Sequence, residues 1–133
     1  MKQFYKRTIF ILSILSFFAL TPAKGQVLED MSTYIRNGNV ASMTKYFDNI
    51  VTINISSNQS SYSKAQAEII LKDFFAKNIV KDFIVMQTGT APNNNCKYAI
   101  GTLATSTANY QLYFLLKLKG EGYLLQEIRI ENK

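Results

Sequence analysis

The sequence contains no histidine and no tryptophan, and Cys96 is its single cysteine among 133 residues. Without histidine, the chain lacks the side chain that most often serves as a base near neutral pH. One cysteine cannot form an internal disulfide, so packing must hold the fold together. A thiol nucleophile needs a base close by. We therefore interpret Cys96 as a small, half-buried side chain at the start of a strand.

A concentrated basic surface is also missing. The formal charge of +6 comes from 15 basic and 9 acidic residues, but Lys2, Lys6, Arg7 and Lys24 all lie within the first 25 positions. Without these four, 11 basic and 9 acidic residues remain, which is a net charge of +2. These charges are dispersed, whereas nucleic-acid-binding proteins cluster their lysines and arginines. The sequence therefore predicts no nucleic-acid partner.

The first 25 residues have the pattern of a signal peptide. A positive start is followed by an uncharged apolar run over 8–20 and then by small residues at Ala23 and Gly25. This order is typical of secretory signals, and the run is shorter than the roughly 20 residues that span a bilayer as a helix. We expect cleavage after Gly25, a secreted or periplasmic location, and no membrane association after the signal is removed.

Residues 26–133 are long enough for one domain and too short for two. Hydrophobic spacing and turn residues predict two helices, a strand, a polar loop, a third helix and four strands, in that order. Their expected ranges are 27–38, 40–47, 49–55, 56–61, a helix from Lys64, and strands at 82–90, 96–106, 109–119 and 123–131. Gly38 should end the first helix at positive φ, and Asn39 should cap the second. The predicted fold class is α+β.

The third helix carries the clearest local signals. Ser63 followed by Gln66 is a capping box, which starts the helix at Lys64. Residues at helical spacing then form one apolar stripe: Ala67, Ile70, Leu71, Phe74 and Phe75. Two acid-to-base pairs flank it: Glu68 with Lys72 and Asp73 with Lys77. Ile69 points away from the stripe, as a scattered surface residue or as a contact with another chain.

The last two strands predict their own register. A three-residue loop over 120–122 pairs Lys119 with Tyr123 and fixes every other partner. The inner face then sets four residues against four: Leu112, Phe114, Leu116 and Leu118 against Ile130, Ile128, Gln126 and Leu124. The outer face mixes charges with Tyr113, Leu115, Tyr123 and Leu125. For the strand at 96–106, the sequence does not decide which side chains face inward. They are either Tyr98 and Ile100 or Ala99, Gly101 and Leu103.

The element order is similar to the cone-shaped fold of the nuclear-transport-factor-2-like superfamily, in which a curved sheet wraps around helices. More narrowly, the segments "IRNGNVASMTKYFDNIVTINI", "YSKAQAEIILKDFF" and "YAIGTL" resemble a bacterial exported family of unknown function, domain of unknown function 4783. The resemblance spans about Val27 to Ile130. It implies N-terminal helices packed on a curved, mainly antiparallel sheet, and it implies export. It implies no reaction and no catalytic residue.

The superfamily also includes enzymes of the ketosteroid isomerase and scytalone dehydratase types, which implies an acid or a His–Asp pair inside the cone. In this sequence only Asp48 and Asp82, each just before a strand, are placed to point inward; both also suit turn positions. Metal-ligand spacing, a phosphate loop and a Ser-His-Asp set are missing. We therefore predict no catalytic residue, no metal and no cofactor, with a lyase or isomerase that uses an inward acid as the alternative.

Two non-catalytic hypotheses remain. In the first, the cone binds a small apolar ligand, with Phe74, Phe114 and Gln126 lining a pocket of few polar groups. Its alternative is a filled core in which Gln126 bonds to backbone or to a tyrosine hydroxyl. In the second, the domain docks on another exported protein or on itself as a homodimer, because apolar patches mark contact surfaces. The residues for that interface are Tyr113, Leu115, Tyr123 and Leu125.

Overall fold

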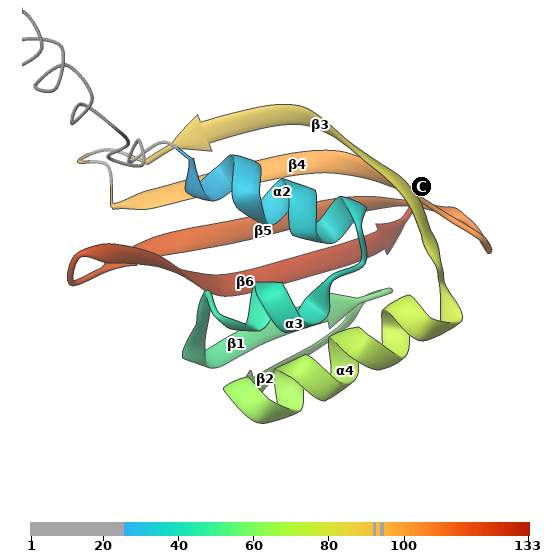
Figure 1. Cartoon of the computed structure of the whole chain (residues 1–133), viewed down its shortest axis with the longest axis horizontal. Coiled ribbons are helices and arrows are strands. Elements are labelled where there is room, and N and C mark those ends of the chain that lie inside the picture. Colours follow the sequence, from blue (N-terminus) through green and yellow to red (C-terminus); the bar gives the residue numbers. More distant parts are fainter. Residues whose placement is uncertain (1–25, 92, 94) are drawn as a thin grey trace, which may run out of the picture.

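In the part of the chain that the structure describes, residues 26–91, 93 and 95–133, a six-stranded sheet carries three helices on one face (Figure 1). The structure is a computed structural model. The predicted signal peptide, residues 1–25, lies outside the described residues. The elements are α2 (Val27–Arg36), α3 (Val40–Thr44), β1 (Phe47–Ile55), β2 (Asn58–Ser63), α4 (Lys64–Lys77), β3 (Val80–Thr90), β4 (Cys96–Thr105), β5 (Asn109–Lys119) and β6 (Gly122–Asn132). The predicted α+β order is confirmed, with β2 as an additional strand.

The strands lie in the order β2-β1-β6-β5-β4-β3. β1 runs parallel to β6, and the other four pairings are antiparallel. Helix α2 packs on β3 and β4, whereas α4 packs on β1 and β2. The core between helices and sheet is fully buried and includes Met31, Leu71, Phe114 and Ile128. We call the side of the sheet that faces this core the inner face, and the opposite side, where none of the described helices lies, the outer face.

The end of α2 and the starts of α3 and α4 follow the local signals in the sequence, whereas the predicted end of the second helix at 47 is wrong, because α3 ends at Thr44 and Phe47 begins β1. Ser63 Oγ accepts a hydrogen bond from the Gln66 amide at 3.3 Å, and α4 begins at Lys64 as predicted. Gly38 has a φ of 62°, and Asn39 Oδ1 accepts from the backbone of the next turn. Both expected acid-to-base pairs form, Glu68 with Lys72 at 2.8 Å and Asp73 with Lys77 at 3.0 Å. Ile69 is 67% exposed, on the side away from the core.

The predicted polar loop over 56–61 is wrong, because most of it belongs to strand β2. Ser56 and Ser57 form a two-residue turn with φ values of 51° and 71°, and the chain then pairs with β1 in antiparallel register. Turns of this kind are usually signalled by Asn-Gly or Asp-Gly. β2 is an edge strand whose side chains are exposed except for the half-buried Tyr62. Its sequence therefore shows no apolar alternation, and backbone pairing defines the strand.

The predicted register of the last hairpin is correct for one half and wrong for the other. Lys119 pairs with Gly122, so the loop has two residues instead of three. A β-bulge between Leu115 and Leu116 then inserts Gln126 as an extra residue in β6. Beyond the bulge the predicted pairs form, such as Phe114 with Ile128. On the loop side every β6 residue is shifted by one, and a shift of one residue moves a side chain to the other face.

The structure also shows which side chains of β4 face the core. Ala99, Gly101 and Leu103 point inward, and Tyr98 and Ile100 point outward. A Cβ atom on Gly101 would lie 2.5 Å from the Ile84 carbonyl oxygen and 2.6 Å from the Phe83 ring. Glycine is therefore required where β3 and its buried phenylalanine approach β4 most closely. Cys96 is half-buried at the first position of β4, as predicted.

Candidate functional site

The outer face of the sheet is the candidate site, because all three described helices lie on the opposite side (Figure 1). Pairing across β4, β5 and β6 arranges its side chains in three rows. They are the Glu127 row (Tyr98, Leu115, Glu127), the Arg129 row (Ile100, Tyr113, Arg129) and the Glu131 row (Thr102, Gln111, Glu131). Four half-buried side chains on β4 and β5, in the Glu127 and Arg129 rows, form what we call the outer patch: Tyr98, Ile100, Tyr113 and Leu115.

Aromatic contacts organise the outer patch. The rings of Tyr98 and Tyr113 lie 6.1 Å apart between centroids. Tyr98 also crosses the edge strand β3 directly over Gly89, where an added Cβ would lie 2.3 Å from the ring. The Gln87 side-chain amide donates to the Tyr98 hydroxyl at 3.3 Å. Tyr98 therefore reaches from β4 across β3, with the far end of its side chain beside the glycine.

Charged groups border the patch along β6. The Arg129 guanidinium lies 5.2 Å from the centre of the Tyr113 ring, a cation–π contact, and Arg129 Nε donates to Glu127 Oε1 at 2.7 Å. This hydrogen bond and the charge of Glu127 raise the pKa of Arg129, so the guanidinium stays charged. Burial, followed by the Glu127 carboxylate, raises the pKa of Tyr113, so its phenol stays neutral at physiological pH. The outward side chains of β6 thus alternate in sign at Glu127, Arg129 and Glu131.

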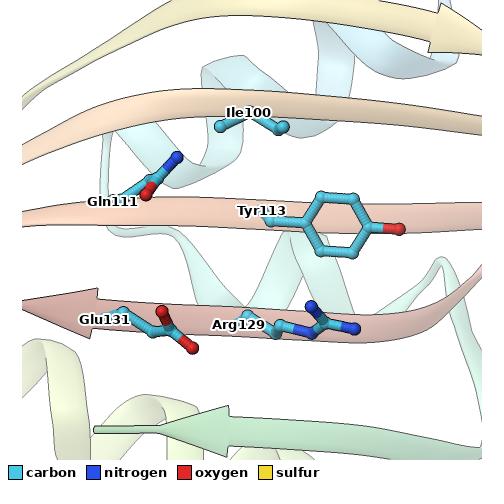
Figure 2. Close-up of a pocket in the computed structure, with 5 residues that line it drawn as sticks. All are labelled: Ile100, Gln111, Tyr113, Arg129 and Glu131. Carbon is cyan, nitrogen blue, oxygen red and sulfur yellow. The ribbon is translucent and has the colours of Figure 1, made fainter.

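A hollow of about 320 Å³ opens beside the patch. Its lining comes from the Arg129 and Glu131 rows: Ile100, Gln111, Tyr113, Arg129 and Glu131. Figure 2 shows these side chains on neighbouring strands, with the helices behind the sheet. The hollow therefore combines an apolar floor with one cationic and one anionic group, and it faces away from the core.

The residues predicted to line an internal ligand pocket occupy other places. Phe114 is fully buried, and Phe74 packs edge-on against Phe75 and Tyr110 at 5.4 Å from each ring centre. Gln126 lies on the bulge and donates its side-chain amide to Asp48 Oδ2. None of these three predicted residues lines the hollow on the outer face.

The four residues predicted for an interface divide between the two faces. Tyr113 and Leu115 lie on the outer face as expected, at the centre of the outer patch. The expected outer positions of Tyr123 and Leu125 are wrong, because the bulge at Gln126 reverses the facing of this part of β6. Leu125 is fully buried, and Tyr123 packs against the core. Sequence reasoning missed Tyr98 and Ile100, whose facing depended on the register between β4 and β5.

The two candidate acids, Asp48 and Asp82, both contact polar or charged groups. Asp48 accepts from Gln126 and from the Asn49 amide, and its side chain lies 3.7 Å from the Lys119 ammonium. The Gln126 hydrogen bond is the main cause that lowers the pKa of Asp48. Asp82 is half exposed and pairs with Arg36 at 3.5 Å. Among the described residues, no group of three or more histidine, cysteine, aspartate or glutamate side chains is placed to hold a metal ion.

Comparisons with known proteins identify the fold and the family. The sequence profile described as "Domain of unknown function (DUF4783)" matches residues 28–131. None of the curated proteins matches the chain. Within the described residues, no helix combines the length and the apolar character needed to cross a membrane.

Solved structures agree with the profile. A DUF4783 family protein from Bacteroides uniformis is 24% identical, with a TM-score of 0.77 over 80% of this chain and 97% of the other. One from Bacteroides ovatus is 27% identical, with a TM-score of 0.75 over 85% and 96%. An NTF2-like protein of unknown function from Cytophaga hutchinsonii is 8% identical, with a TM-score of 0.60 over 87% and 95%. These neighbours confirm the predicted resemblance and the cone-like fold.

Proposed function

The chain belongs to the family described as domain of unknown function (DUF4783), and we propose that it is an exported, non-catalytic domain that pairs with a second copy of itself through the outer patch. One observation carries the proposal. Tyr98, Ile100, Tyr113 and Leu115 stand together in the middle of a sheet face that no described helix covers. Contiguous apolar side chains on the surface of a soluble domain usually mark a contact. Export is supported by the sequence pattern of residues 1–25.

The size of the face is sufficient for a stable pair. Five strand spacings of about 4.8 Å and strands of roughly 10 residues at about 3.4 Å each give a face on the order of 800 Å². Stable protein complexes bury about 800 Å² on each partner. On this face the aromatic residues of the outer patch lie on β4 and β5, and the charged residues of β6 lie beside them. Aromatic residues and arginine are both enriched at protein interfaces.

The charges along β6 favour a second copy over a partner of uniform charge. Glu127, Arg129 and Glu131 alternate in sign on the outer face. A uniformly acidic or basic partner would place like charges against either Arg129 or the two glutamates. Like charges placed together lower the binding affinity. A copy with its strands reversed can set each charge against an opposite one, because a twofold interface uses the same patch on both sides.

Neither of the other hypotheses gains comparable support. A pocket for a small apolar ligand depended on Phe74, Phe114 and Gln126, of which the two phenylalanines are packed in the core and Gln126 is bonded to Asp48. A lyase or isomerase that uses an inward acid depended on Asp48 or Asp82. The pKa of Asp48 is lowered, the reverse of what a general acid requires.

Sedimentation analysis of the purified protein tests the proposal. We expect twice the monomer mass for the wild type and the monomer mass for Leu115→Lys, which places a charge at the centre of the outer patch. The matched control is Ile69→Lys, because Ile69 is an exposed apolar residue on α4, away from the outer face. A wild type that stays monomeric at high micromolar concentration would refute the proposal, as would an Ile69→Lys variant that dissociates equally.

A further inference from the structure

We infer that the two copies are related by a twofold axis that runs across the strands, between the Glu127 row and the Arg129 row. This inference rests on the proposed self-association and specifies its geometry. In this arrangement Arg129 of each copy faces Glu127 of the other. Four steps lead from the described side chains to this axis.

The first step concerns the direction of the axis. Two sheets that pack face to face through equivalent surfaces are related by a twofold axis in the plane between them. An axis along β6 would set each β6 residue against itself, and Arg129 would face Arg129 of the other copy. An axis across the strands reverses the strand direction, so that each row faces a different row. The alternating charges of β6 therefore favour the axis across the strands.

The second step concerns the position of the axis. An axis between the Glu127 and Arg129 rows sets Tyr113 against Leu115 and Ile100 against Tyr98. These contacts join apolar side chains, which gain most from leaving water. An axis between the Arg129 and Glu131 rows would also pair opposite charges, because Arg129 of each copy would face Glu131 of the other. It would, however, bury Ile100 and Tyr113 against the Glu131 row's polar side chains, Thr102 and Gln111.

The third step concerns the charges at the axis. Glu127 and Arg129 already form an ion pair within one copy at 2.7 Å. Across the proposed axis, the second copy's pair lies alongside in reversed order, so each charge has an opposite charge on both sides. A network of four charges beside the outer patch contributes more than an isolated exposed pair.

The fourth step concerns the hollow. Under the proposed axis the Glu131 row faces the outward residues on the hairpin-loop side of the Glu127 row, and on β5 this residue is Lys117. Lys117 is exposed and lies two residues beyond Leu115 on the same face. The hollow is lined by Gln111 and Glu131, among others, and has room for a lysine side chain. The second copy's Lys117 therefore enters the hollow and meets the Glu131 carboxylate.

Charge reversal in mixed dimers tests the geometry. Arg129→Glu alone places four carboxylates around the axis, and Glu127→Arg alone places four guanidinium groups there. We expect each variant to weaken self-association at least 10-fold in sedimentation experiments. An equimolar mixture should recover a heterodimer with a Kd within about 10-fold of the wild type, since every facing pair is again opposite in sign. The ion pair within each copy stays broken in this mixture, so recovery reports the contact between copies.

Two controls and a second variant pair make the result decisive. Glu121→Arg at the hairpin tip and Lys64→Glu at the start of α4 reverse exposed charges away from the outer face, and both should associate like the wild type. A mixture of Lys117→Glu and Glu131→Lys tests whether Lys117 of one copy meets Glu131 of the other in the hollow. Each variant alone should associate weakly, and the mixture should recover a heterodimer. Neither of these residues is in an ion pair within the described structure, so both variants should keep the wild-type circular dichroism spectrum.

The outcomes separate the inference from the proposed function. A heterodimer from both mixtures supports the axis. If the wild type dimerises but neither mixture recovers, the axis is wrong while self-association stands. If Arg129→Glu recovers with Glu131→Arg instead, the axis lies between the Arg129 and Glu131 rows. A monomeric wild type overturns the inference together with the proposed function.

Discussion

The side-chain amide of Gln126 donates a hydrogen bond to Asp48 Oδ2, which ties the bulge of β6 to the start of β1. The two residues are 78 positions apart in the sequence. The bulge supplies the extra residue that turns Leu125 into the core. This contact therefore holds the bulge that separates the loop side of β6 from the half that borders the outer patch.

The Asp48 carboxylate should make folding depend on pH. The Gln126 hydrogen bond is the largest cause that lowers its pKa in the folded protein. For a carboxyl group with a lowered folded pKa, the stabilisation is complete above the unfolded value near 3.9 and is lost as the pH falls through the folded value. Urea unfolding of the wild type and Asp48→Asn should differ at pH 7, and the difference should shrink below about pH 4. A difference that grows on acidification would contradict this assignment.

The Ser63 cap should contribute measurable stability. Ser63→Ala removes the hydroxyl that accepts from the Gln66 amide at the start of α4. We expect a loss of about 1 kcal/mol in the free energy of unfolding, the usual cost of a lost cap. Ser60→Ala, at an exposed position on the edge strand β2, is the matched control and should change stability by less than about 0.5 kcal/mol.

Phe74 should behave as a core residue. The residue is 8% exposed, and its ring contacts the rings of Phe75 and Tyr110. Phe74→Ala should lower the free energy of unfolding by about 3 to 5 kcal/mol in urea titrations, because it removes buried surface and leaves a cavity. A near-neutral result would indicate that the ring lines an open cavity, and it would revive the hypothesis of an internal ligand. Ile69→Ala on the solvent side of α4 should be close to neutral.

Two glycines in the sheet should respond differently to alanine. A Cβ on Gly101 meets the backbone oxygen of Ile84 at 2.5 Å, so Gly101→Ala should cost about 1 to 3 kcal/mol in thermal or urea unfolding. A Cβ on Gly89 meets only the far end of the Tyr98 side chain, which can move. Gly89→Ala should therefore change stability less, and it should weaken self-association because it displaces a ring of the outer patch. Equal stability losses at both positions would argue against this explanation.

The proposed signal peptide predicts a definite mass for the exported protein. Intact mass spectrometry of material recovered outside the cytoplasm should show a chain that begins at Gln26. Ala23→Leu should block this processing, because signal peptidases require small side chains at that position. A chain that retains residues 1–25 after export would refute cleavage after Gly25.

Much of the fold was readable from local sequence. The cap at Ser63, the turn at Gly38 and the apolar stripe of α4 depend on residues within one or two helical turns of each other. Alternating side chains also located β1, β3, β4, β5 and β6. Only part of the candidate site was predicted from the sequence. Tyr113 and Leu115 were placed correctly, because they lie beyond the bulge, where the predicted register is correct. Tyr98 and Ile100 were not, because their facing depends on how β4 pairs with β5.

The sequence by itself determined the helices, most strands and the lack of histidine chemistry, because capping, periodicity and composition are properties of neighbouring residues. Only the tertiary structure decided that Asn58–Ser63 is a strand, that β6 bulges at Gln126, and that Tyr98 and Ile100 face outward. These features depend on which strand lies alongside, and the pairing of distant segments is chosen by the packing of the whole sheet against its helices. The outer patch exists for the same reason, since its side chains come from separate strands that only pairing brings together.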